Sequence, residues 1–160
     1  MRLHLFASLA VALTLGACAT TPRPSASYVD PAINAADAKT LADDAAAYLS
    51  GPLPPAHTTL VIDPPAARDM ADVLTPALQI ALRAKGYGIF ILSADRPSTK
   101  ELPEPQTGTV LRYLANPLET GVVLRLQFHG MEASRFYQRS NDGVLLPNGF
   151  PFTVGGANEQ

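Results

Sequence analysis

The feature that most constrains the fold is a helical period enclosed by two β-forming runs. Residues 66–85 repeat apolar side chains along one helical face. The runs on either side, 57–63 (HTTLVID) and 87–92 (YGIFIL), favour strands. This succession predicts a βαβ unit with parallel strands and a right-handed crossover, although an antiparallel pair also fits the spacing. Pro76 should kink or split the helix, because it removes one backbone hydrogen bond.

The last third of the chain carries strand signals only. They follow a proline-rich loop at 93–107 and are separated by turn residues, and they lie at 109–115, 121–129, 133–139 and 149–154. We therefore predict an α+β fold in which one principal helix packs on a mixed, mainly antiparallel sheet. This small domain should span residues 57–155, with a tail at 156–160.

The last long hairpin turns near Gly130, and its register depends on the length of the turn. A two-residue turn of Gly130 and Met131 would bring Leu126 opposite Arg135, and would place an arginine on the apolar face, which is costly. A three-residue loop pairs Leu126 with Ser134 instead. We favour the three-residue loop, because a buried apolar face specifies the register.

The favoured register places two arginines together on the outer side of the hairpin. Arg125 and Arg135 would face each other there, with Tyr137 beside them. Like charges directly opposite each other are mildly destabilising unless an acid or a partner protein offsets the repulsion. An ordinary solvated face is the favoured interpretation, and a partner surface formed by Arg125, Arg135 and Tyr137 is the alternative.

Residues 33–50 (INAADAKTLADDAAAYLS) predict a short acidic helix in front of the domain. Asn34 is a plausible N-cap and Gly51 lies where a C-cap would be. Aspartates at 37, 43 and 44 give the helix its charge. Its apolar face is mostly alanine, so we expect an accessory helix that docks weakly.

The N-terminus predicts a lipoprotein signal peptide over residues 1–17. Arg2 supplies a positive start, and residues 5–15 are apolar but shorter than the roughly 20 residues that a membrane-spanning helix needs. Leu15-Gly16-Ala17-Cys18 resembles the bacterial lipobox. Two alternatives are an ordinary signal peptide that leaves Cys18 as a free thiol, and a buried core helix.

The lipobox implies that cleavage occurs before Cys18, with diacylglycerol on its sulfur and an acyl chain on the new amino group. These covalent lipids are the only cofactor-like groups that we predict, and they would hold the protein to a membrane. Residues 18–32 are rich in small, polar and proline residues and should form a tether. Residue 19 is Ala, not the Asp that commonly retains such proteins at the inner membrane, so we expect a periplasm-facing outer-membrane location.

Signals for catalysis, metal binding and nucleic-acid binding are weak throughout the sequence. His57 and His129 stand apart from other ligand-type residues, and no serine lies in a nucleophile motif. Asp43-Asp44, Asp69 and Asp72 read as solvated helix charges. We predict no catalytic residue and no metal site. A net charge of −2 gives no reason to expect direct nucleic-acid binding.

Two segments resemble a known family. They are residues 81–92 (ALRAKGYGIFIL) and 111–154 (LRYLANPLETGVVLRLQFHGMEASRFYQRSNDGVLLPNGFPFTV). Together with the lipobox at Cys18, they resemble TrbH-type conjugal transfer lipoproteins over most of residues 58–154. The segments 33–50 and 93–107 are weaker matches to the family.

The resemblance implies an outer-membrane lipoprotein of a conjugative type IV secretion system, the apparatus that moves plasmid DNA between bacteria. Its role there would be structural or in assembly, and its partners would be other secretion-channel proteins. Only Cys18 carries over as a functional residue. The alternative is a pilot, a chaperone or a ligand-binding lipoprotein of another envelope complex.

Overall fold

The computed structural model describes residues 27–66, 72–92, 108–147, 149 and 151–156, and it confirms the α+β class. The described helices are α1 (Ala35–Leu49), the short 3-10 helix η1 (Pro55–His57) and α2 (Leu74–Ala84). The described strands are β1 (Tyr28–Val29), β2 (Thr59–Ile62), β3 (Gly88–Ile91), β4 (Thr109–Leu118), β5 (Gly121–Phe128), β6 (Met131–Arg139), β7 (Leu145–Pro147) and β8 (Thr153–Gly156).

The strands form one mixed sheet in the order β3-β2-β4-β5-β6-β7. In it β2 pairs in parallel with both β3 and β4, so the predicted parallel pairing across the helix is confirmed. From β4 to β6 the chain forms an antiparallel meander. The short strand β1 pairs in parallel with β4, and the short strand β8 pairs antiparallel with β6.

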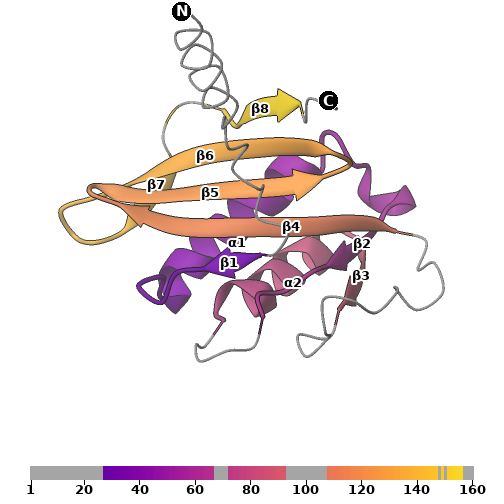
Figure 1. Cartoon of the computed structure of the whole chain (residues 1–160), viewed down its shortest axis with the longest axis horizontal. Coiled ribbons are helices and arrows are strands. Elements are labelled where there is room, and N and C mark those ends of the chain that lie inside the picture. The colour runs from indigo at the N-terminus through magenta and orange to yellow at the C-terminus, as the bar shows by residue number, and fades with distance from the viewer. Residues whose placement is uncertain (1–26, 67–71, 93–107, 148, 150, 157–160) are drawn as a thin grey trace, which may run out of the picture.

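Both α-helices lie behind the sheet in Figure 1 and cover the same face of it. The core fills the space between the helices and this inner face. Its largest fully buried side chains include Tyr113, Tyr137, Leu41, Leu78 and Leu124. The opposite face is called the outer face below. Alternate residues of each strand therefore point either into the core or toward the outer face.

Helix α1 is part of this core, so the prediction of a weakly docked accessory helix was wrong. Its helical range and its Asn34 N-cap are confirmed: the Asn34 side chain accepts from Ala36 N and Asp37 N. The helix buries six apolar residues almost completely: Ala38, Leu41, Ala42, Ala45, Ala46 and Leu49. Small alanine side chains allow the helix to approach its neighbours closely. We had expected weak docking because a single alanine is only weakly hydrophobic.

Helix α2 begins at Leu74, later than predicted, and residues 67–71 of the predicted range lie outside the described residues. The Asp72 carboxylate caps it by accepting from Leu74 N and Thr75 N. Pro76 therefore lies in the first turn, where backbone N–H groups have no partner within the helix. The predicted kink at Pro76 was wrong for this reason.

The folded part of the chain includes residues that were predicted to be a tether. Ser27 is buried, and its hydroxyl donates to Asp63 O and accepts from Tyr113 N. Tyr28–Val29 then forms β1 against β4. The tether prediction of 18–32 was therefore too long at its C-terminal end.

The hairpin between β5 and β6 closes on the pair Phe128 and Met131, with His129 and Gly130 as its turn. Both turn residues have positive φ, 49° and 69°, as a type I′ turn requires. Arg135 consequently pairs with Leu124 and faces the core. Both registers that the sequence analysis considered were wrong, because neither used a left-handed His129.

The glycine at the start of β5 has a packing role. A Cβ atom on Gly121 would lie 2.0 Å from the backbone oxygen of Tyr137 and 2.8 Å from the Phe136 ring. The two strands therefore approach each other here more closely than any side chain at this position allows.

We predict that Gly121→Ala lowers the free energy of unfolding by about 2–3 kcal/mol, because the strand must move to relieve the overlap. Gly155→Ala is the matched control, since a Cβ there meets nothing within 4 Å, and it should change stability by less than about 0.5 kcal/mol. Urea denaturation followed by circular dichroism measures both. Equal stability of the two variants would contradict the close approach.

Candidate functional site

A largely buried polar cluster joins α1 to the inner face of β6. The Arg135 guanidinium donates through one nitrogen to both Asp44 carboxylate oxygens, at 3.0 and 2.9 Å. The Tyr137 hydroxyl donates to the same carboxylate at 2.6 Å. The Arg135 and Asp44 side chains are only 17% and 21% exposed. Asp44 was predicted to be a solvated helix charge, and this prediction was wrong.

A second ion pair joins the same two elements. Arg139 donates to both oxygens of Asp37, at 3.0 and 2.9 Å, and the Asp37 side chain is only 2% exposed. Two parallel N–H···O bonds of this kind are among the stronger and more directional polar contacts in proteins. The hydrogen bond to Asp37 raises the pKa of Arg139 above its ordinary value, and the nearby negative charge adds to the effect.

Two buried tyrosines connect the helices to the sheet, and both phenols are held protonated. Burial raises the pKa of Tyr137 far above its ordinary value, and the hydrogen bond to Asp44 and its charge raise it further, against a smaller opposing effect of Arg135. Burial likewise raises the pKa of Tyr113. Thr75 is hydrogen-bonded to both Asp72 and the Tyr113 hydroxyl, so Asp72 is no solvated charge either.

These clusters hold elements in place and offer no reactive group. The Asp44 carboxylate is occupied by a guanidinium and a phenol, and the Asp37 carboxylate by a second guanidinium. A general base needs a lone pair that can reach a substrate, and a nucleophile needs such a base beside it. The arrangement therefore acts as a pair of clamps between α1 and β6.

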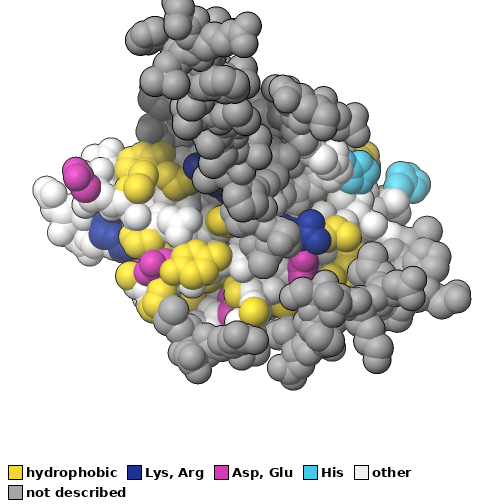
Figure 2. Space-filling view, in the orientation of Figure 1, with side chains coloured by type: hydrophobic (Ala, Val, Ile, Leu, Met, Phe, Trp, Pro, Cys, Tyr) yellow, Lys and Arg dark blue, Asp and Glu magenta, His cyan; other side chains and the backbone are white. Residues whose placement is uncertain are grey.

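The outer face of the sheet carries mixed charges among apolar side chains. Arg112 pairs with Asp63 at 2.8 Å, and Arg125 lies 3.7 Å from Glu132. Figure 2 looks onto this face and shows yellow hydrophobic patches between basic and acidic side chains, with undescribed residues covering part of it. The side chain of Arg125 is half exposed, at 51%.

The structure separates the three residues of the partner surface that the sequence analysis considered. Arg125 lies on the outer face opposite Ser134, whereas Arg135 and Tyr137 point inward and bind Asp44. The predicted contact between two like charges across the hairpin does not form. Of the three, Arg125 alone has its side chain on the outer face.

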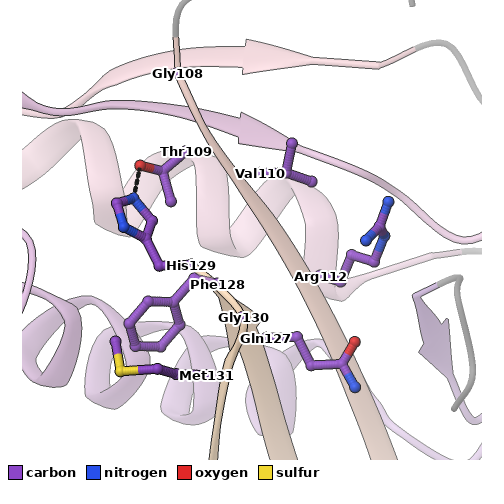
Figure 3. Close-up of a pocket in the computed structure, with 9 residues that line it drawn as sticks. All are labelled: Gly108, Thr109, Val110, Arg112, Gln127, Phe128, His129, Gly130 and Met131. Carbon is purple, nitrogen blue, oxygen red and sulfur yellow. Dashed lines mark hydrogen bonds between the residues drawn. The ribbon is translucent and has the colours of Figure 1, made fainter. Parts of the chain in front are cut away.

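A depression of about 430 Å³ lies where β4 begins and β5 ends. His129 is hydrogen-bonded to Thr109 on one side of it, close to Phe128, while Arg112 and Gln127 lie on the other side (Figure 3). Its polar groups come from opposite faces of the strands and do not converge on one centre. We therefore assign no ligand to it.

The described part of the chain brings no three His, Cys, Asp or Glu residues together as a metal site, and none of its helices is long and apolar enough to cross a membrane. His57 is exposed in η1. Cys18, the predicted lipid-attachment residue, lies outside the described residues, so its role stays a prediction.

We predict that Asp44→Ala lowers the free energy of unfolding by about 2–3 kcal/mol, because Arg135 then keeps its charge in a largely buried site without its carboxylate. Asp43→Ala is the matched control on the same helix. Among the described residues, Asp43 forms an ion pair with exposed Lys39 alone, so its loss should cost less than about 0.5 kcal/mol. Adding Arg135→Met to Asp44→Ala should recover part of the stability. Equal effects of the two aspartate variants would contradict the clamp.

The comparisons with known proteins give a family for the whole arrangement. The chain matches the family model described as "Conjugal transfer protein TrbH" over residues 20–154. The match begins two residues after Cys18 and includes α1, which the resemblance in the sequence had left aside. No curated protein and no solved structure matches the chain. Because the family match spans most of its length, the chain belongs to the TrbH family of conjugal transfer proteins.

Proposed function

We propose that this protein is a lipid-anchored outer-membrane component of a conjugative type IV secretion system, with a structural or assembly role. The observation that carries the proposal is the TrbH family match directly following the lipobox Leu15-Gly16-Ala17-Cys18. Family membership supports the transfer function, and the lipobox supports the anchor. A mature chain that begins at Cys18 would contain the whole matched range.

The proposed anchor would be strong enough to fix the location of the protein. Each buried CH₂ group contributes about 0.8 kcal/mol, so one acyl chain binds reversibly and two or more bind stably. The described fold begins at Ser27, so residues 19–26 alone separate it from the cysteine. An extended chain of that length reaches about 30 Å. The folded domain would therefore face the periplasm from close to the membrane surface.

The use of charged side chains supports a structural role in this proposal. Asp37 and Asp44 bind Arg139 and Arg135 within the fold, and stabilise one arrangement of helix and sheet. The domain would thus present a fixed surface to other channel proteins. The net charge of −2 gives no long-range attraction to plasmid DNA, so the expected partners are proteins and the membrane.

We predict that Cys18→Ser abolishes acyl labelling and leaves the unprocessed precursor, because the serine hydroxyl cannot form the thioether. Ala19→Asp is the matched variant: it keeps the cysteine, and should be labelled normally but fractionate with the inner membrane. Metabolic labelling with a fatty acid and membrane fractionation on a density gradient measure both outcomes. Normal processing and labelling of the Cys18→Ser chain would contradict the lipoprotein proposal.

We predict that a donor cell lacking this protein transfers its plasmid at a strongly reduced frequency. The unsubstituted chain should restore transfer, and Cys18→Ser should restore it poorly at an equal protein level. A mating assay that counts plasmid-bearing recipients measures each strain. Undiminished transfer from the deletion strain would contradict a role in the transfer apparatus.

A further inference from the structure

The outer edge of β3 is open in the described part of the chain. Strand β3 pairs with β2 on one side, and no described strand pairs with it on the other. It is held firmly in place: Leu92 N donates to Ile62 O after the strand, and the Tyr87 hydroxyl donates to Leu53 O before it. The edge is therefore a fixed row of backbone groups.

Successive residues of a strand direct their N–H and C=O groups toward opposite edges, so only alternate residues of β3 can hydrogen-bond to a further strand. Leu92 N is directed toward β2, so the N–H and C=O groups of Phe90 point the same way. The groups of Ile89 and Ile91 then point outward. Two donors and two acceptors, one pair on each side of Phe90, are available to a further strand.

The sequence of β3 does not protect this edge, in contrast to the sequences at the ends of β1 and β7. Proteins usually blunt an open edge with a charge, a proline or a bulge. Asp30 and Pro31 follow β1, and β7 ends with Pro147. Strand β3 reads Gly-Ile-Phe-Ile, with neither charge nor proline, and the Phe90 side chain is 41% exposed.

We propose that β3 pairs antiparallel with β3 of a second copy of this chain, with Phe90 on the two-fold axis. Ile89 of one copy then lies opposite Ile91 of the other, and the outward N–H and C=O groups of each match those of its partner. The two Phe90 side chains form a cross-strand aromatic pair on the outer face. The strand is neutral and self-complementary, which favours a second copy over a charged partner strand.

The pairing would join two sheets into one continuous sheet. Antiparallel strands related by this axis keep the same face on the same side, so the helices of both copies cover one face together. The proposal does not depend on the lipid anchor, because β3 belongs to the folded domain. Its test is therefore distinct from the tests of the proposed function.

Disulfide trapping tests the geometry directly. Phe90→Cys in the full chain should give a covalent dimer under mild oxidation, because non-hydrogen-bonded antiparallel pairs bring Cα atoms to about 4.5 Å, within disulfide range. Leu146→Cys, also exposed and on edge strand β7, is the matched control. The unsubstituted chain reports any cross-link through Cys18. A Phe90→Cys chain that stays monomeric, or equal trapping at position 146, would overturn the proposal.

Sedimentation of the detergent-solubilised full chain gives a second, independent readout. The chain should dimerise, and Phe90→Lys should raise the dissociation constant by about tenfold or more by placing like charges on the axis. Leu146→Lys should leave it unchanged, and circular dichroism should show both variants folded. A monomeric unsubstituted chain, or an unchanged dissociation constant for folded Phe90→Lys, would overturn the proposal.

Discussion

The ion pair between Arg135 and Asp44 is the interaction on which the rest of the structure depends. An arginine on the core-facing side of a strand is costly unless a carboxylate meets it. Asp44 does so from α1, and Tyr137 adds a hydrogen bond to the same carboxylate. A shift of β6 by one residue would turn Arg135 outward and bring Phe136 to the helix instead. One pair therefore specifies both the hairpin register and the docking of α1.

The second pair, Arg139 with Asp37, makes the docking directional. Asp37 and Asp44 lie seven residues apart on the helix, which is two turns and about 10 Å along one face. Arg135 and Arg139 lie four residues apart on β6, which is about 13 Å along one side of the strand. The spacing of the two aspartates on α1 is close enough to that of the two arginines on β6 for the flexible arginine side chains to form both ion pairs. Helix α1 therefore runs antiparallel to β6, with the Asp37 pair in its first turn and the Asp44 pair two turns further along.

Local patterns in the sequence predicted most of the helices and strands. The features that they did not predict depend on contacts between residues far apart in the chain. The helical period, the apolar β runs and Asn34 are local signals, and they predicted α1, most of α2 and the β4–β6 meander. The register was missed because Arg135 and Asp44 are 91 residues apart in the chain. Strand β1 was missed because two residues in a small, polar segment carry no period. The Cys18 motif is local and readable, but it lies outside the described fold.

Membership of a conjugal transfer family gives this architecture its context. Within the described residues, Asp37 and Asp44 bind helix α1 to strand β6. The buried face of α1 makes this helix an integral layer of the domain. Hydrogen–deuterium exchange on the full chain tests this most directly. We predict that the amides of Leu41–Leu49 exchange as slowly as those of β5, since both would open only on global unfolding. Exchange of α1 at the rate of an exposed loop would contradict it.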